Sequence, residues 1–482
     1  MQTISNALYA SNLTMSVTLS GPSNGASLAT ATAIGTILNP NPQPVLSIAS
    51  TSANEGSSLS FAVTRSGTTA NALTVNYATA NGSAISGTNY TSASGTLSFG
   101  SGVTTQNIAV PTSDDGVYTS NLAMSVSLSS PTGGAALGTA SATGTIVNTD
   151  VQPSLSIAGA SANEGANLSF AVSRSGALGN AITVNYGTAN GSATSGTNYS
   201  ATSGTLTFGS GVASQVILVP TSVDNVYSGN LAMSVSLNSP TGGAVLGTGS
   251  ATGTIVNTDA QPSLSIAAAT ANEGSPLAFT VSRTGATGNA VTVSYSTSNG
   301  TAASGVNYNA TSGSLAFAPG VTSQVVSVPT IDDYINTGNL SMSVLLSAPG
   351  GGATLGASSA SGTIVNIDPA VSLSIGTASA AEGSNLNFTV TRSGGTAGAV
   401  SAHWATSNGT ALAGTNYTGA SGTVNIAAGA TTGTITVTTL HDCVVTGSKN
   451  MYVTLSSPSA GLTISGATGS GSISNIDKIN CN

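Results

Sequence analysis

The chain repeats itself with a period of 109 residues, and this repeat constrains its fold more than any other feature. The segment PVLSIASTSANEG at 44–56 returns as PSLSIAGASANEG at 153–165, as PSLSIAAATANEG at 262–274 and as AVSLSIGTASAAEG at 370–383. A unit of this length is a whole domain, because solenoid repeats are only about 20–50 residues long. We therefore expect four full domains, which occupy residues 44–150, 153–259, 262–368 and 370–482.

Residues 1–39 form a fifth, incomplete copy that holds only the last third of the repeat. GTIL at 35–38 corresponds to GTIV at 144–147, 109 residues later. The first 20 residues lack the basic start and the continuous apolar core of a signal peptide. We expect either that export processing has removed one or that the chain begins inside a longer polypeptide. Two strands alone bury too little apolar surface to be stable, so other strands should complete this copy.

Apolar and polar residues alternate within each copy, which is the pattern of half-buried β-strands. In the first full copy it runs through Leu59, Phe61 and Val63. Clusters of Gly, Asn, Ser and Pro separate about seven such segments. They lie near 45–49, 58–65, 72–79, 95–100, 105–111, 121–129 and 139–148. Seven short antiparallel strands are typical of an immunoglobulin-like β-sandwich, and no segment has a helical stripe.

These patterns predict an all-β fold of tandem seven-stranded immunoglobulin-like β-sandwiches. The linkers between copies are short and contain proline, as in the segment 148–153. Such linkers leave little freedom for independent tumbling, so we expect an elongated rod.

The composition excludes several classes of function. Charged residues make up 4% of the chain, with 14 Asp and Glu against six Lys and Arg, for a net charge of −8. A nucleic-acid surface needs clustered Lys and Arg, and a membrane-spanning helix needs about 18 consecutive apolar residues, so we expect neither. General acid–base catalysis needs titratable side chains, which are sparse, so we do not expect an enzyme.

Cys443 and Cys481 are the only cysteines of the chain. From the residues alone they fit two free thiols, a metal-binding pair or one disulfide. Two thiols without a nearby histidine cluster make a poor zinc site. Low charge and the absence of other cysteines favour an extracellular chain.

A series of short motifs in each copy resembles the Calx-beta domain. In the first full copy these motifs are Glu55-Gly56, VTRSG at 63–67, VNYATANGSA at 75–84, Asn89-Tyr90, GTLSF at 95–99, Asp114-Asp115 and TIVNTD at 145–150. The resemblance covers residues 44–477 as four copies and 1–39 as a partial one. It implies a seven-stranded sandwich of the kind found in sodium–calcium exchangers, in an integrin subunit and in large bacterial surface and adhesion proteins.

The resemblance also implies Ca²⁺ sites in acidic loops at one pole of each sandwich. Ca²⁺ takes six to eight oxygen ligands. The matching positions are Glu55, Asn89, Asp114, Asp115 and Asp150; Glu164, Asn198, Asp224 and Asp259; Glu273, Asn307, Asp332, Asp333 and Asp368; and Glu382, Asn416, Asp442 and Asp477. These positions include all 14 acidic residues of the chain.

The sequence departs from the family pattern at several of these positions. Asn replaces an aspartate in all four copies, and Val223 and His441 replace the first aspartate of the acidic pair. The partial copy has Asn6 and Asn41 at positions of site aspartates. Three or four carboxylates are enough for one Ca²⁺ per pole, and a bound cation would relieve their repulsion. The alternative is that these residues cap turns through backbone hydrogen bonds.

The same resemblance predicts a disulfide between Cys443 and Cys481. Each cysteine follows an aspartate of the same pole, Asp442 and Asp477 respectively, so the two thiols should be close. A disulfide closing a loop of about 38 residues would contribute roughly 3–4 kcal/mol. Two free thiols are the alternative and would fit a reducing compartment.

The sequence therefore predicts a secreted or cell-surface structural or adhesive protein with a rigid tandem-sandwich rod. Its expected partners are further copies of itself or the rest of a longer parent chain. Strand addition from a neighbour to residues 1–39 would make it a filament subunit. The alternative function is a calcium-responsive module whose interdomain stiffness depends on Ca²⁺.

Overall fold

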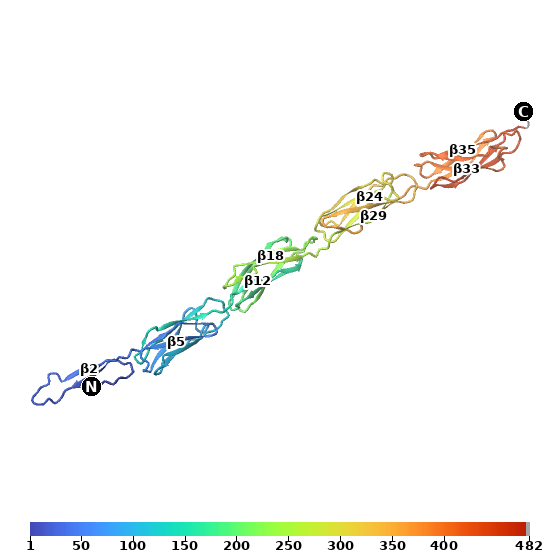
Figure 1. Ribbon diagram of the computed structural model, residues 1–482. Coiled ribbons are helices and arrows are strands. Elements are labelled where there is room, and N and C mark those ends of the chain that lie inside the picture. The colour runs from blue at the N-terminus through green and yellow to red at the C-terminus, as the bar shows by residue number, and fades with distance from the viewer. Residues whose placement is uncertain (479–482) are drawn as a thin grey trace. The chain divides into compact units, whose positions relative to one another are not determined.

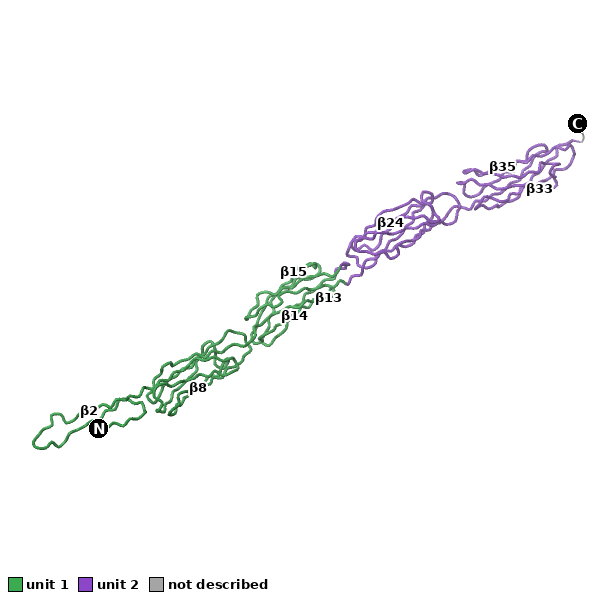
Figure 2. The backbone as a smooth tube through the Cα atoms, viewed as in Figure 1, with its two compact units in different colours: residues 1–223, 229–257 green, residues 224–228, 258–482 purple. Residues whose placement is uncertain are grey.

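The computed structural model describes residues 1–478. The chain forms two compact units, which Figure 2 shows in different colours. The first unit comprises residues 1–223 and 229–257, and the second comprises residues 224–228 and 258–482. Residues 1–478 contain strands, turns and loops and no helix, so none of them forms a helix that could cross a membrane. We call the four full copies repeats 1 to 4.

Each repeat is a sandwich of two sheets, which confirms the predicted all-β fold. The strands of repeat 1 are β3 (Val45–Ile48), β4 (Thr51–Asn54), β5 (Ser58–Ser66), β6 (Leu73–Asn81), β7 (Ser94–Phe99), β8 (Thr105–Pro111), β9 (Leu122–Ser129), β10 (Ala136–Leu137) and β11 (Ser141–Val147). One sheet has the order β10-β3-β5-β8 and the other the order β4-β11-β9-β6-β7.

The other repeats have the same topology (Figure 1). Repeat 2 has β12 (Ser154–Ile157), β13 (Ala160–Asn163), β14 (Asn167–Ser175), β15 (Ile182–Asn190), β16 (Ser203–Phe208), β17 (Ser214–Pro220), β18 (Leu231–Asn238), β19 (Val245–Leu246) and β20 (Ser250–Val256). Repeat 3 has β21 (Ser263–Ile266), β22 (Ala269–Asn272), β23 (Leu277–Thr284), β24 (Val291–Asn299), β25 (Ser312–Phe317), β26 (Ser323–Val328), β27 (Leu340–Gly350), β28 (Thr354–Leu355) and β29 (Ser359–Val365). Repeat 4 has β30 (Ser372–Ile375), β31 (Ala378–Ala381), β32 (Asn385–Ser393), β33 (Val400–Asn408), β34 (Ser421–Ile426), β35 (Thr432–Thr438), β36 (Lys449–Ser456), β37 (Thr463–Gly466) and β38 (Thr468–Ser474).

The alternating residues form the core between the two sheets. Leu59, Phe61 and Val63 of β5 are fully buried, whereas their polar neighbours on the same strand face outward. Gly144 of β11 lies opposite these side chains, and a Cβ atom there would be 2.5 Å from Phe61 Cζ. The ring therefore needs glycine at this position, and glycine recurs there in the other repeats, at Gly253, Gly362 and Gly471.

The structure has nine strands per repeat rather than the expected seven, and two of the pairings are parallel. After Ile48 the chain crosses from one sheet to the other, so that β3 and β4 belong to different sheets. β4 then pairs in parallel with β11, and the two-residue β10 pairs in parallel with β3. β4 and β10 lie outside the seven predicted segments, because strands of four and two residues are too short for alternation to reveal them reliably.

The partial copy contributes one antiparallel pair, β1 (Leu13–Thr18) and β2 (Thr32–Ile37). Its register, Leu13 opposite Ile37, equals that of β9 and β11 one period later, where Leu122 lies opposite Ile146. Within residues 1–478 the two strands form a sheet of their own. Val17 is therefore 40% exposed, whereas the equivalent Val126 of repeat 1 is fully buried.

Repeats 1 and 2 are joined by reciprocal hydrogen bonds between two loops of the first unit. The Tyr118 N–H donates to Asn180 Oδ1 (2.9 Å), and Asn180 Nδ2 donates to the Tyr118 carbonyl (3.2 Å). The Gly179 N–H also donates to the Gly116 carbonyl (2.8 Å). The Tyr118 ring lies against Gly243 of repeat 2, since a Cβ atom there would be 3.2 Å from the ring. We call this Tyr–Asn pairing the junction clasp.

In repeats 1 to 3, an arginine near the end of the first long strand holds the loop that carries the clasp asparagine. Arg174 is 5% exposed, and its Nη1 donates to the Asn180 carbonyl at 2.7 Å. Burial lowers the pKa of the Arg174 guanidinium. The arginine thus stabilises the loop that faces the preceding repeat.

The full clasp recurs once, one of its hydrogen bonds recurs at Asn289, and the clasp is absent between repeats 3 and 4. Tyr9 and Asn71 form it between the partial copy and repeat 1, with distances of 2.8 and 2.9 Å. Asn289 Nδ2 donates to the Tyr227 carbonyl at 3.2 Å between loop 224–228 and repeat 3. Between repeats 3 and 4 the equivalent residues are Asn336 and Gly398, and Asn336 Nδ2 donates to the Asp368 carbonyl instead.

We expect Asn180→Ala to loosen the junction between repeats 1 and 2. It removes two hydrogen bonds of about 0.5–1.5 kcal/mol each. Amide exchange at Tyr118 and Gly179 should therefore accelerate about tenfold or more, while exchange in the core strands should stay unchanged. Hydrogen exchange followed by mass spectrometry measures both. Asn107→Ala, at an exposed position of β8, is the control and should change neither; equal acceleration by both variants would contradict the role of the clasp.

Candidate metal site at the acidic poles

In repeat 1, three carboxylates from three loops meet at one pole. Glu55 follows β4, Asp115 lies in the loop after β8, and Asp150 follows β11. One oxygen of each lies within 4.8 Å of the others. The parallel pairing of β4 with β11 explains this, because parallel strands end at the same edge and so bring Glu55 beside the segment 148–150.

Backbone and side-chain donors hold two of these carboxylates in place. Glu55 Oε1 accepts hydrogen bonds from the Thr149 N–H (2.6 Å) and hydroxyl (3.2 Å). Asp115 Oδ2 accepts one from Asn89 Nδ2 (3.0 Å), and its Oδ1 accepts one from the Val117 N–H (3.0 Å). One oxygen of Asp115 therefore caps a turn, as the turn-capping alternative predicts, while the other is held by Asn89.

Asp150 is the carboxylate whose surroundings best fit a cation. Its Oδ2 is buried and has no hydrogen-bond partner. Burial raises the pKa of the Asp150 carboxyl, and the negative charges of Glu55 and the Asp114-Asp115 pair raise it further. A buried carboxylate oxygen without a donor is costly, and a bound cation would remove that cost. Glu55, Asp115 and Asp150 are thus the residues of repeat 1 that would hold Ca²⁺.

Repeat 3 has the same arrangement, except that the first aspartate of the pair Asp332-Asp333 joins the group, whereas in repeat 1 it is the second, Asp115. Oxygens of Glu273, Asp332 and Asp368 lie within 4.8 Å of one another. Glu273 is 7% exposed, and its Oε1 accepts a hydrogen bond from the Ile367 N–H (2.8 Å). Burial raises the pKa of both Glu273 and Asp368, and neighbouring negative charges raise both further. Asp368 Oδ2, like Asp150 Oδ2, is buried without a hydrogen-bond partner.

In repeat 4 the acidic group consists of Glu382, Asp442 and Asp477, again within 4.8 Å. The Ile476 N–H donates to Glu382 Oε1 (3.0 Å). His441 occupies the position of Asp114 and pairs with Asp477, with Nε2 and Oδ1 separated by 2.8 Å. The pole of repeat 4 therefore combines an imidazole with its carboxylates.

The acidic residues of repeat 2 are divided between the two units. The Glu164 N–H, in the first unit, donates to the Val256 carbonyl (3.1 Å). Asp224 Oδ1, in the second unit, accepts a hydrogen bond from the Val226 N–H (3.0 Å). Asp259, also in the second unit, is partly buried.

The four asparagines predicted as ligands direct their oxygens toward the backbone. Asn89 Oδ1 accepts a hydrogen bond from the Ile85 N–H (2.9 Å) while its amide nitrogen donates to Asp115. Oδ1 of each other asparagine accepts the N–H four residues earlier, for Asn198, Asn307 and Asn416 alike. Asn307 and Asn416 also donate to Asp333 and Asp442. In repeats 1, 3 and 4 the asparagine therefore supports an aspartate with its amide nitrogen, while its oxygen holds the backbone.

Cys443 is exposed, and it is a free cysteine within residues 1–478. Cys481 lies outside the described residues, so its predicted disulfide with Cys443 stays a prediction. Sequence reasoning did not anticipate that Cys443 Sγ lies 3.6 Å from His441 Nδ1. The two residues are only two positions apart, and this spacing was the signal that could have been used.

Comparison with known proteins identifies the family. The model of the Calx-beta domain matches residues 43–150, 156–259, 261–372 and 366–477. Similar solved structures include CBD12 from CALX1.2, which is 18% identical over 44% of this chain and 100% of its own, with a TM-score of 0.24. The apo-form Calx CBD1 domain is 26% identical over 23% of this chain and 100% of its own, with a TM-score of 0.22. No curated protein matches the chain. Because the four family matches cover most of its length, the chain belongs to the Calx-beta family.

Proposed function

We propose that this protein is an extracellular structural or adhesive protein whose tandem sandwiches act as a stiff spacer, and that it is not an enzyme. The junction clasp is the observation that carries the proposal. Between repeats 1 and 2 its two hydrogen bonds, the Gly179–Gly116 hydrogen bond and an aromatic contact reinforce a linker of only a few residues. A two-repeat junction held in this way resists bending, and stiffness is what a spacer requires. Charged residues are sparse in the protein, which suits a role that depends on shape rather than on electrostatic attraction.

We further propose that the protein is the subunit of a surface filament. The support is the β1–β2 pair, which has the register of β9 and β11 but exposes the residues that repeat 1 buries. Strands from a neighbouring chain would cover this face by strand addition, as a sandwich needs two sheets. The alternative is that further residues of a longer parent chain cover this face.

Electron microscopy and hydrogen exchange of the purified chain test the proposal together. We expect filaments, with the amides of β1 and β2 protected in the filament and exchanging rapidly in the dissociated monomer. A monomer whose residues 1–39 are already protected would refute strand addition. A near-spherical scattering envelope would refute the spacer itself.

The second candidate function is a calcium-responsive module, favoured by the buried Asp150 and Asp368 oxygens that lack hydrogen-bond partners. In repeat 1 the loop that carries Asp115 also carries Tyr118 of the clasp, so a cation there would tighten the junction. Small-angle scattering in Ca²⁺ and in EDTA separates the two candidates. A longer particle in Ca²⁺ favours the responsive module, and an unchanged length favours the plain spacer.

A further inference from the structure

Repeat 4 departs from the other repeats at two neighbouring positions of its pole. His441 stands where repeats 1 to 3 have Asp114, Val223 and Asp332. Cys443 stands where they have Gly116, Asn225 and Tyr334. Both changes introduce a nitrogen or sulfur donor into a pole that otherwise offers oxygen. The chemistry of this pole therefore differs from that of a site made for Ca²⁺ alone.

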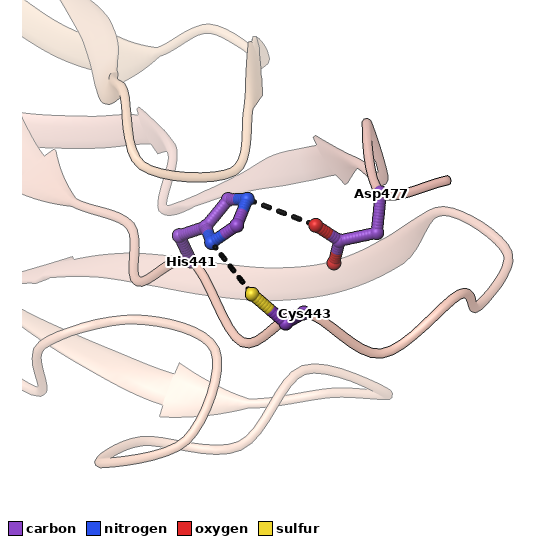
Figure 3. A group of neighbouring side chains, drawn as sticks. All are labelled: His441, Cys443 and Asp477. Carbon is purple, nitrogen blue, oxygen red and sulfur yellow. Dashed lines mark hydrogen bonds and ion pairs between the residues drawn. The ribbon is translucent and has the colours of Figure 1, made fainter. Parts of the chain in front are cut away.

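The two donors face each other and the carboxylate of Asp477, as Figure 3 shows. His441 Nδ1 is 3.6 Å from Cys443 Sγ, and its Nε2 is 2.8 Å from Asp477 Oδ1. One ligand atom from each of the three residues lies within 4.8 Å of the others. The Asp477 side chain is fully enclosed, whereas 43% of the His441 side chain is exposed, so the group has a fixed inner wall and an open outer side.

The backbone at the position of Cys443 has the same left-handed conformation in all four repeats. Cys443 has a φ of 57°, close to 63° at Gly116, 57° at Asn225 and 54° at Tyr334. This left-handed conformation is unusual for a residue other than glycine or asparagine. All four repeats therefore have this backbone position, but only repeat 4 has a cysteine there. Only repeat 4 also has a histidine two residues earlier, at His441.

We propose that His441, Cys443 and Asp477 bind a divalent transition-metal ion of the zinc class. Sulfur, imidazole nitrogen and carboxylate oxygen are the donors that Zn²⁺ prefers, whereas Ca²⁺ prefers oxygen alone. Binding forms metal–sulfur and metal–nitrogen bonds and releases the thiol proton to solvent. Asp477 either ligates the ion or orients the imidazole through its second nitrogen, as carboxylates do in many zinc sites.

The proposal also predicts competition between two kinds of ion at this pole. Asp477 belongs both to this group and to the acidic group with Glu382 and Asp442. An ion bound by His441 and Cys443 therefore withdraws one carboxylate from the acidic group. His441 and Cys443 lie outside the acidic group, so Ca²⁺ competes with the transition metal only for Asp477.

Cobalt serves as the probe, because Co²⁺ replaces Zn²⁺ in such sites and its bond to a thiolate absorbs in the near ultraviolet. The full chain is kept reduced with a non-thiol reductant and titrated with Co²⁺ in excess Ca²⁺. We expect one Co²⁺ per chain with a thiolate-to-cobalt band that Zn²⁺ abolishes. Cys443→Gly and His441→Asp give repeat 4 the residues of repeat 1 at these positions. Cys443→Gly should abolish the band, and His441→Asp should weaken metal binding at least tenfold.

Two further variants make the result specific. His403→Gln removes the only other histidine of the chain, which lies on β33, and should leave binding unchanged. Cys481→Ser should retain the band, since Cys443 supplies the thiolate. Circular dichroism of each variant checks that repeat 4 stays folded. The proposal is overturned if the reduced chain gives no band, if the band survives Cys443→Gly, or if His441→Asp binds the metal as tightly as the parent chain.

Discussion

Replacing Phe279 with alanine should destabilise repeat 3 by about 3–5 kcal/mol, because it deletes a fully buried ring and leaves a cavity. The ring fills the space opposite Gly362, where a Cβ atom would lie only 2.6 Å from Phe279 Cζ. The glycine cannot refill the gap. A domain of this size is stable by about 5–15 kcal/mol, so the variant repeat becomes marginal. Chemical denaturation, monitored by hydrogen exchange of the amides in β23 and β29, measures the loss in the free energy of unfolding.

The same experiment tests whether the repeats fold as separate domains. The buried cluster around Phe279 consists only of residues from repeat 3, so the other repeats should keep their transitions. Val325→Ala is the matched control: this residue of β26 is 53% exposed, and its truncation should cost no more than about 0.5 kcal/mol. A common shift of all transitions, or a loss below about 1 kcal/mol for Phe279→Ala, would show that the core has been misassigned.

The long strands were predictable because their pattern is carried by consecutive residues. Phe279 alternates with outward-facing neighbours on β23, and the 109-residue period repeats this pattern four times. The crossing from β3 to β4 was not predictable, because four residues per strand are too few to show which sheet they join. Yet this crossing brings Glu55 beside Asp150 and so makes the acidic pole.

For the sites, sequence alone identified residue types but not their partners. The acidic residues were found because their positions recur, and the structure brings three carboxylates of repeats 1, 3 and 4 together. The orientation of Asn89 depends on the backbone of a five-residue turn, which no spacing rule reveals. Tyr118 and Asn180 also recur at the repeat period, but they are 62 residues apart and lie in different repeats. Only the packing of one sandwich on the next pairs them.

The stability of repeats 1 and 3 should depend on pH in opposite ways in EDTA and in Ca²⁺. Burial, followed by repulsion from neighbouring carboxylates, raises the pKa of Asp150 and Asp368, and burial likewise raises that of Glu273. A carboxyl whose pKa is raised on folding favours the folded state when protonated. Its contribution is complete below the unfolded values of about 3.9 for Asp and 4.3 for Glu. It is lost as the pH rises through the folded pKa. In EDTA, these groups should therefore make repeats 1 and 3 more stable as the pH falls from 7 toward that window.

A bound cation reverses this dependence, because it needs the carboxylates ionised. At pH 7, Ca²⁺ at 100 times its dissociation constant should stabilise each occupied repeat by about 2.7 kcal/mol. For a domain of about 100 residues, this corresponds to a rise in melting temperature of roughly 10–20 °C. Acidification should then remove the gain, since protons compete with the cation for Asp150 and Asp368. Calorimetry from pH 7 to pH 4, in Ca²⁺ and in EDTA, measures both curves.

Asp150→Asn separates the cation effect from the proton effect within one chain. The substitution removes the buried carboxyl of repeat 1, so this repeat should lose its calcium gain and most of its pH dependence in EDTA. Repeat 3 keeps Asp368 and should retain both, which makes it the internal control. Equal melting curves in Ca²⁺ and EDTA at pH 7 would exclude a calcium site. A repeat 1 that still gains stability from Ca²⁺ in the variant would place the cation elsewhere than at Asp150.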